Sequence, residues 1–412
     1  MMPIKNNLPA WLENLKSNAL EKFNTSGFPS VREEEWRYTN VSTFTKKLLL
    51  TTSITNIDID QLKQWKLADC YYLVLVNGSP RFDDDFPEEV TALPLYYALN
   101  RHSDLIENYL GKAVAKENNG FIDFNTANFT YGLFLHLTSG ETLDKPLQII
   151  HVVTQEAMAN TRHLVILEEN SQATIIETFV NFHNQSYLSN SVLEGFIAEN
   201  AELTLYKLQN ESEKAFHFGG AYIQQANNSK FIHHNFVLGG LLARSEIHCD
   251  LETAAICELN GLYLGKNRQH LDNHTRINHN KPDGISREFY KGILNDRARG
   301  VFQGRVIVAE NAQKTDSQMN NRNLLLSADA EIDTKPQLEI YADDVKCAHG
   351  MTIGQLEEKS IFYLQSRGID LESAKHILTF AFANEMVDKI SFEPLKHLLQ
   401  NLLLQRLPIE LL

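Results

Sequence analysis

A cysteine and a histidine stand two residues apart late in the chain, as Cys347 and His349. Their flanks are typical of a β-strand, in which side chains alternate between two faces, so the thiol and the imidazole are expected to point from the same face. These are the side chains that best hold soft or borderline metal ions. Two ligands complete only half of a tetrahedral site, so a metal here needs further ligands from elsewhere. From the spacing alone, a buried cysteine beside a hydrogen-bonded histidine is the commoner arrangement.

A second group of metal-ligand side chains has a different spacing. It contains one carboxylate and three imidazoles: His270, Asp272, His274 and His279. The spacing does not match one face of a helix or of a strand, and the Asn and Thr residues between them indicate a corner of the chain. A metal site is therefore the less favoured interpretation. The other cysteines, Cys70, Cys249 and Cys257, are expected to pack in the core, because a free cysteine behaves as a small hydrophobic residue.

The composition excludes several classes of function. Of the 412 residues, 43% are hydrophobic and 22% are charged, as in an ordinary globular protein. The net charge of −14 argues against a nucleic-acid partner, which requires a concentrated basic surface. No stretch approaches about 18 continuous apolar residues, so no membrane span is expected. Four scattered cysteines and an N-terminus without a signal-type stretch predict a reduced, cytoplasmic location.

The first part of the chain carries mixed signals. Residues 8–48 have helical character, with Gly27-Phe28-Pro29 ending the first run. Tyr71 to Val76 is a β-rich run closed by the turn-forming residues 77–80, and residues 95–114 suit a helix again. We therefore expect an N-terminal mixed α/β cap domain over residues 1–118.

From about Tyr131 to Gly354 one short strand pattern follows another, and similar turn sequences recur at their corners. The recurring turns begin at Asn170, Asn200, Asn227, Thr253, Asn311, Asp329 and Asp343. Their intervals are about 30 residues or roughly half of that, as if each coil contained two corners. Asn and Asp tolerate the left-handed backbone of a sharp corner. Such a unit cannot bury a face alone, so successive coils must stack. The sequence predicts a β-solenoid over residues 119–356 rather than a lectin-like sandwich.

The remaining residues, 357–412, have helical periodicity and are expected to form a C-terminal helical domain. One predicted apolar face contains Leu371, Ala374, Ile377, Leu378 and Ala381, and the next contains Leu395, Leu398, Leu399, Leu402 and Leu403. Ser391 is expected to cap the second helix, with Pro394 near its first turn.

Six short stretches occur in the order seen in one protein family. They are Phe302-Gln303-Gly304, Lys314-Thr315-Asp316, Asn323-Leu324-Leu325-Leu326-Ser327, Pro336-Gln337-Leu338-Glu339-Ile340, Cys347-Ala348-His349-Gly350 and Ser366-Arg367-Gly368-Ile369. Together with Val31-Arg32-Glu33-Glu34-Glu35-Trp36-Arg37-Tyr38-Thr39, they resemble the SufBD family of iron–sulfur cluster assembly proteins. The chain has Asn321-Arg322-Asn323 where the SufB branch carries a cysteine, and Gly350 where that branch has a glutamate. It is therefore similar to the SufD branch.

The resemblance implies a mainly β fold, a right-handed parallel β-helix flanked by the two other domains. It also implies a non-catalytic scaffold subunit that pairs with SufB through the β-helix and docks the SufC ATPase through about Gly368 to Asp388. His349 is the first choice and Cys347 the second for contacting a nascent iron–sulfur cluster, which would be transient and shared with SufB rather than held stably by this chain. The isolated chain is expected to self-associate as a homodimer through the same surface.

Two other classes of function stay open from the residues themselves. One is a β-helix enzyme acting on polysaccharides, which would use carboxylates along one solenoid face. Asp343 and Asp344 are adjacent, however, and point to opposite faces if they lie on a strand. The other is a non-catalytic metal-binding interaction protein. Reduced flavin accompanies family complexes, but no dinucleotide fingerprint in this chain supports binding it.

Overall fold

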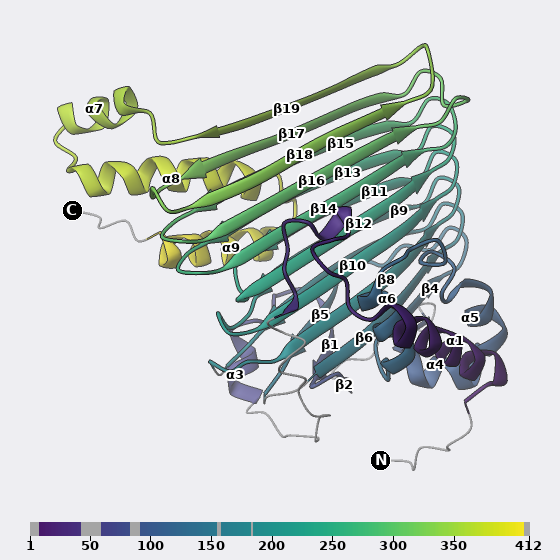
Figure 1. Ribbon diagram of the computed structural model, residues 1–412. Coiled ribbons are helices and arrows are strands. Elements are labelled where there is room, and N and C mark those ends of the chain that lie inside the picture. The colour runs from purple at the N-terminus through teal and green to yellow at the C-terminus, as the bar shows by residue number, and fades with distance from the viewer. Residues whose placement is uncertain (1–7, 43–58, 83–90, 155–157, 183, 408–412) are drawn as a thin grey trace.

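The computed structural model describes residues 8–42, 59–82, 91–154, 158–182 and 184–407. Most of these residues form two long sheets that face each other (Figure 1). In spatial order, the first sheet, sheet A, contains β19 (Lys346–Gly354), β17 (Asp316–Leu325), β15 (Ile285–Leu294), β13 (Ile256–Gly265), β11 (Lys230–Val237), β9 (Glu202–Asn210), β7 (Gln172–Val180), β5 (Leu147–Val152), β1 (Tyr71–Val76) and β2 (Ser79–Phe82).

The second sheet, sheet B, is built from the strands that alternate with these along the chain. In spatial order it contains β18 (Glu331–Ile340), β16 (Arg299–Val308), β14 (His270–His279), β12 (Leu242–Leu251), β10 (Phe216–Gln225), β8 (Leu188–Ile197), β6 (Met158–Leu167), β4 (Leu133–Leu137) and β3 (Thr91–Pro94). From β4 onward each strand pairs in parallel with the next strand but one, so each coil adds one strand to each sheet. The predicted parallel β-solenoid, with an N-terminal α/β region and C-terminal helices, is confirmed.

The corner residues follow the predicted pattern only in part. Asn170 and Asn200 have φ of 59° and 58°, in the left-handed region, as expected. The next two corners place their left-handed residue one position later than predicted, at Asn228 and Ala254. Asn311, Asp329 and Asp343 were also predicted as left-handed corners, and they are not. The corner after β16 uses Lys314 instead, with φ of 60°.

The main core lies between the sheets, where inward side chains of both form one continuous apolar cluster from Leu73 to Ala342. Helices pack against part of each outer face (Figure 1). The C-terminal helices α7 (Glu358–Ser366), α8 (Leu371–Val387) and α9 (Glu393–Arg406) lie on the side of sheet A, where α8 and α9 share a second apolar cluster with its odd-numbered strands. The N-terminal helices α1 (Ala10–Ser26), α4 (Leu95–Arg101), α5 (Ser103–Tyr109) and α6 (Gly120–Asn128) lie on the side of sheet B.

The N-terminal strands are hydrogen-bonded into the solenoid. β1 pairs in parallel with β5 and forms a hairpin with β2 through Asn77 and Gly78, both with positive φ, as the turn signal predicts. The short helix α3 (Ile59–Lys63) precedes β1. β3 pairs antiparallel with β4, so both sheets end at this side in antiparallel strands.

The helical prediction for residues 8–48 is wrong for residues 27–41. Gly27 has a φ of 67° and ends α1, and the following residues up to Val41 form turns and irregular chain around the short 3₁₀ helix η1 (Glu34–Trp36). Pro29 cannot supply the N–H that a continuing helix needs. The predicted residues from 43 onward lie outside the described part of the chain.

Two details of the C-terminal helices also differ from expectation. Ser391 does not cap α9, whose N-cap is Phe392, and its hydroxyl hydrogen-bonds Tyr206 at 3.1 Å instead. The five predicted leucines of α9 do pack inward, with Leu398 half-buried. In α8 the predicted Ala374 is buried, and the other buried residues are Ser373, Thr379, Ala383, Met386 and Val387. Leu371 and Ala381, which belong to the predicted apolar face, are exposed.

Candidate functional site

Cys347 and His349 lie on β19, the edge strand of sheet A. The predicted strand is therefore confirmed. β19 pairs in parallel with β17, and its register aligns Cys347 with Ser317 and His349 with Met319. Ser317 and Met319 are buried, and Met319 belongs to the core between the sheets. Because side chains in register on parallel strands face the same way, Cys347 and His349 both project from the inward face of the last coil.

The two side chains differ in exposure because no further coil covers β19. Cys347 is half-buried and packs against the core between the sheets, whereas His349 is exposed. Burial raises the pKa of the Cys347 thiol, so a bound cation is needed to favour its thiolate at neutral pH. Within the described residues, no third His, Cys, Asp or Glu converges with these two at metal-ligand distance.

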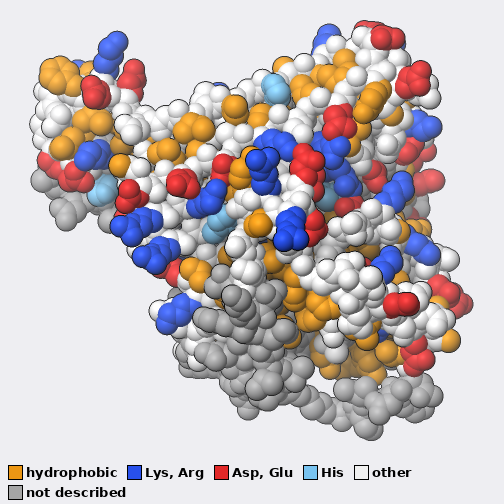
Figure 2. Space-filling view, in the orientation of Figure 1, with side chains coloured by type: hydrophobic (Ala, Val, Ile, Leu, Met, Phe, Trp, Pro, Cys, Tyr) orange, Lys and Arg blue, Asp and Glu red, His pale blue; other side chains and the backbone are white. Residues whose placement is uncertain are grey.

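The solenoid is open at this end. β18 and β19 are both edge strands, and we call them together the terminal coil. At the other end antiparallel β2 and β3 complete the sheets, but the terminal coil has no such cover among the described residues. Its exposed large apolar side chains are Ile340, Met351 and Ile353, and Tyr341 directly after β18 is exposed too. Hydrophobic side chains line the upper rim of the molecule over these strands (Figure 2). An uncovered edge with apolar side chains is a typical strand-pairing interface.

A buried polar network supports β19 from below. Tyr263 Oη donates a hydrogen bond to Asn323 Oδ1 at 2.5 Å, and Asn323 Nδ2 donates to Asn321 Oδ1 at 2.6 Å. Asn323 Nδ2 also lies 3.4 Å from the carbonyl oxygen of Thr352, on β19 itself. Asn323 thus links β19, the strand that carries His349, to the buried side chains beneath it.

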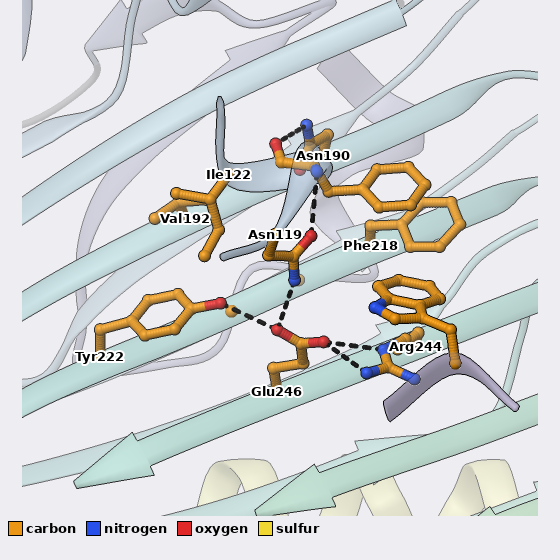
Figure 3. A pocket seen from close by; sticks show the side chains of 12 residues that line it. Asn119, Ile122, Asn190, Val192, Phe218, Tyr222, Arg244 and Glu246 are labelled. Carbon is orange, nitrogen blue, oxygen red and sulfur yellow. Dashed lines mark hydrogen bonds and ion pairs between the residues drawn. The ribbon is translucent and has the colours of Figure 1, made fainter. Parts of the chain in front are cut away.

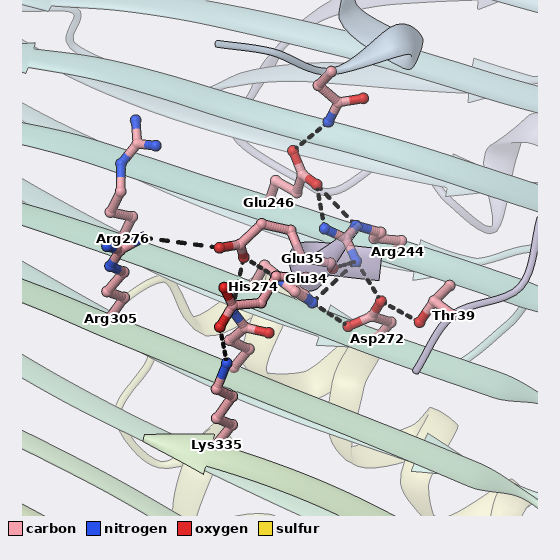
Figure 4. A network of polar contacts seen from close by, with 12 residues as sticks. Glu34, Glu35, Thr39, Arg244, Glu246, Asp272, His274, Arg276, Arg305 and Lys335 are labelled. Atoms are coloured by element: carbon pink, nitrogen blue, oxygen red, sulfur yellow. Dashed lines mark hydrogen bonds and ion pairs between the residues drawn. The ribbon is translucent and has the colours of Figure 1, made fainter. Parts of the chain in front are cut away.

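The N-terminal stretch Val31–Thr39 lies against the outer face of sheet B, where it meets a second polar network (Figure 4). Trp36 is buried, and the Arg244 guanidinium stacks 3.7 Å from its ring centre. Arg244 Nη1 donates to the carbonyl oxygen of Glu35 at 2.9 Å and to Asp272 Oδ2 at 2.7 Å. Burial alone would raise the pKa of Asp272, but His274 and Arg244 hold it well below its ordinary range.

This network corrects the prediction of a corner at residues 270–279. These residues form the continuous strand β14, and His270, Asp272 and His274 share its outer face. The alternating Asn and Thr residues, taken as corner signals, point inward: Asn273 accepts from Asn235 at 3.0 Å, and Thr275 donates to Glu288 at 2.5 Å. His279 lies on the inward face and bonds Ser286 at 2.9 Å. The outward residues are tied to Arg244, Thr39 and Glu35, which fits a structural role.

Arg244 provides a stability prediction. It bridges the buried carboxylates of Glu246 and Asp272, so Arg244→Met leaves two buried charges without their partner. We expect a loss of about 3–5 kcal/mol in the free energy of unfolding, measured by denaturant titration. Arg305→Met is the matched control, because Arg305 pairs with Glu339 in a half-exposed position and should cost less than about 1 kcal/mol. Equal losses in the free energy of unfolding of the two variants would show that the buried network stabilises the protein no more than a half-exposed ion pair does.

A small pocket lies beside this network, and Glu246 is the acidic side chain that lines it (Figure 3). Its volume is about 20 Å³, enough for roughly one water molecule. Glu246 Oε2 accepts from Asn119 Nδ2 at 2.8 Å and from the Tyr222 hydroxyl at 3.0 Å, while Oε1 accepts from Arg244. The carboxylate is therefore fully engaged in joining the N-terminal region to sheet B.

Sequence reasoning missed a third group of polar residues. His151, His163 and Glu177 converge inside the first coils from β5, β6 and β7. Each is a polar residue on the inward face of a strand, a face that carries mostly apolar side chains. That break in the alternation is the signal that a sequence offers, but their convergence depends on the pairing of strands across two sheets.

Among the described residues, no helix combines the length and the hydropathy needed to cross a membrane.

Comparisons with known proteins cover nearly the whole chain. A family model described as SUF system FeS cluster assembly, SufBD core domain, matches residues 150–382, and one described as SufBD protein N-terminal region matches residues 2–149. An iron–sulfur cluster assembly SufBD family protein of Synechocystis sp. is 32% identical over 403 residues, which cover 93% of this chain and 89% of that protein.

Two of the relatives that carry the name iron–sulfur cluster assembly protein SufD are bacterial proteins matched over most of the chain. The Escherichia coli protein is 37% identical over 295 residues, covering 67% of this chain and 70% of the relative. The Bacillus subtilis protein is 25% identical over 418 residues, covering 95% of this chain and 93% of the relative. The chain therefore belongs to the SufBD family of iron–sulfur cluster assembly proteins.

Proposed function

We propose that this chain is a non-catalytic scaffold subunit of a SUF complex, which pairs with a SufB-type subunit and docks a SufC-type ATPase while an iron–sulfur cluster is assembled. The observation that carries the proposal is the terminal coil. It combines an uncovered strand edge with an imidazole and a thiol on one inward face. Such an arrangement suits a metal site that a second subunit completes.

The cluster in this account is cargo that is assembled and passed on, not a resident cofactor. The exposed imidazole of His349 is the first candidate to contact it, because a neutral histidine ligates iron through a ring nitrogen. Cys347 is the second candidate, because its thiol packs partly into the core. One thiol and one imidazole are too few ligands for a cluster, so a partner subunit would supply the rest.

Pairing with a SufB-type solenoid would extend both sheets across the interface. β18 and β19 each offer a row of unpaired backbone groups, and the apolar side chains of Met351 and Ile353 would be buried by the partner. When no partner is present, the same surface suits self-association into a homodimer. All four cysteines are free, which fits assembly in the reducing cytoplasm.

The docking site for the ATPase would lie on α7 and α8. Phe362 and Tyr363 on α7 and Leu371 at the start of α8 are exposed apolar residues, and we call them the α7–α8 surface. α7 has no buried side chain, and Leu371 lies at the exposed first position of α8, ahead of the buried Ser373 and Ala374. An apolar helical surface of this kind is suited to a partner groove.

The double variant Phe362→Ala, Leu371→Ala tests this docking site. Burial of a large apolar side chain is worth about 1.5–3 kcal/mol, so losing two should weaken ATPase binding by at least about 100-fold. Isothermal titration of the purified chain with the ATPase measures the effect. Leu404→Ala on α9, another exposed leucine, is the control and should leave binding unchanged. Equal affinity in the double variant and the control would place the ATPase elsewhere.

The proposal as a whole is tested by co-expression. A tag on this chain should recover the SufB-type subunit and the ATPase together, in a complex that survives gel filtration. If neither partner is recovered and the chain acts on a polysaccharide, the scaffold hypothesis is wrong and the hypothesis of a polysaccharide-acting enzyme takes its place.

A further inference from the structure

The interior of the first coils contains three metal-ligand side chains that the proposed function does not use. His151 on β5 and Glu177 on β7 project from sheet A, and His163 on β6 faces them from sheet B. Their exposed fractions are 6%, 4% and 0%. The group therefore spans the gap between the two sheets in a place that is closed to bulk solvent.

The distances within the group suit ligands of one ion. Glu177 Oε1 lies 3.4 Å from His151 Nε2 and 3.6 Å from His163 Nε2, and the three atoms lie within 4.8 Å of one another. Two ligand atoms that each lie about 2.1 Å from a tetrahedral ion are about 3.4 Å apart. Ordinary N–H···O hydrogen bonds are shorter, at roughly 2.7–3.2 Å.

None of the three atoms makes a hydrogen bond of ordinary geometry within the described residues, although His151 Nε2 and Glu177 Oε1 are close enough for an ion pair. Buried polar atoms nearly always make a hydrogen bond of good geometry, so three unsatisfied polar atoms that point at one another need an explanation. A cavity of about 10 Å³ adjoins Glu177, next to Lys207 and His233, and could hold one further small ligand.

The charges around the group also favour a cation. The Glu177 and Glu211 carboxylates are both buried, and Lys207 is the buried lysine that faces them. Glu211 Oε2 also contacts His217 Nδ1 at 2.8 Å and accepts from Gln209 Nε2 at 2.9 Å. Two carboxylates beside one lysine leave the interior short of positive charge.

We propose that His151 Nε2, His163 Nε2 and Glu177 Oε1 bind one divalent first-row transition-metal ion, with water in the fourth position. Two imidazoles and one carboxylate are a donor set that suits Zn²⁺, Co²⁺ and Fe²⁺. This interior site lies in the first coils, far along the solenoid from β19, and does not depend on the function proposed for the terminal coil.

Ion binding requires one local rearrangement. The Leu133 N–H donates to His163 Nδ1 at 3.0 Å, so the proton of the empty, neutral ring is on Nε2. Coordination through Nε2 moves this proton to Nδ1 and breaks the contact with Leu133, with no net release of a proton. The affinity should therefore be lower than that of a fully preorganised zinc site.

Cobalt titration of the full chain tests the site. The background variant Cys347→Ser, His349→Ala removes the terminal-coil ligands, and one equivalent of Co²⁺ should still bind to it with the intense visible absorption of a four-coordinate ion. Adding His151→Gln or Glu177→Gln should weaken binding by on the order of 100-fold or more. His233→Gln is the matched control, because His233 is also a buried inward histidine with an orphan Nδ1 but lies outside the group.

X-ray absorption of the Zn²⁺-loaded background variant provides a second readout that needs no interior substitution. The expected zinc environment has two imidazoles and oxygen but no sulfur. If the glutamine variants fail to fold, as circular dichroism would show, this spectrum decides the question. The absence of stoichiometric binding to the background variant, a zinc–sulfur distance, or equal loss in His233→Gln would each overturn the proposal.

Discussion

Replacing Met351 and Ile353 by aspartate should prevent the chain from pairing through its terminal coil. Both side chains are about half exposed, at 52% and 50%, and project from the inward face of β19 in register with Asn321 and Asn323. Loss of two buried apolar side chains removes about 3 kcal/mol or more, and the introduced charges add a desolvation cost. We expect the dissociation constant for the SufB-type subunit to rise at least about 100-fold.

The substitution should leave the fold intact, because neither side chain is part of the core. Analytical ultracentrifugation of the mixed subunits measures pairing, and circular dichroism checks the fold. Leu20→Asp on α1 is the matched control, since Leu20 is 46% exposed but lies among the N-terminal helices that cover sheet B. Normal pairing by the double aspartate variant would exclude the terminal coil as the interface.

Replacing His349 by alanine should sharply reduce cluster formation while leaving the complex assembled. The side chain is exposed, so its removal creates no cavity, and the hydrogen bonds of β19 to β17 do not involve it. Loss of a metal ligand lowers metal affinity by at least about tenfold. Iron, acid-labile sulfide and visible absorbance of the co-expressed three-protein complex should fall accordingly.

The control for this variant is Cys347→Ser, which should have a smaller effect. The thiol packs partly into the core, and burial raises its pKa, so it is the less available ligand. ATPase activity of both complexes should match that of the wild type. Undiminished iron and sulfide in the His349→Ala complex would show that the imidazole is structural.

Local signals were enough to predict the architecture. Asn170 and Asn200 mark corners that the structure confirms, and alternating apolar positions predict strands such as β19. These signals depend on the conformational preference of single residues or on side-chain period, which need no knowledge of distant contacts.

Polar residues inside the solenoid are where the prediction failed. Asn273 and Thr275 face inward on β14 and bond to Asn235 and Glu288, so an uninterrupted strand looked like a corner. The convergence of His151, His163 and Glu177 had no local signal, because register across two sheets decides which inward residues meet. The exposed position of Leu371 likewise depends on where α8 meets sheet A.

The terminal coil itself was predictable only in part. Its strand and the shared face of Cys347 and His349 follow from their spacing, but the sequence does not reveal that β18 and β19 are both edges. That openness results from the chain leaving the solenoid after Gly354 for the helices beside sheet A. It is this exit that leaves His349 uncovered.

The central claim is that two subunits share the cluster site, and iron and sulfide content measured on separate and assembled subunits tests it most directly. The chain, the SufB-type subunit and their three-protein complex with the ATPase would be reconstituted anaerobically with the same iron and sulfide. The account predicts a cluster on the complex, none above background on this chain alone, and a lower content when the complex carries His349→Ala. A cluster of equal content on this chain alone, or a complex that forms its cluster equally well without His349, would contradict it.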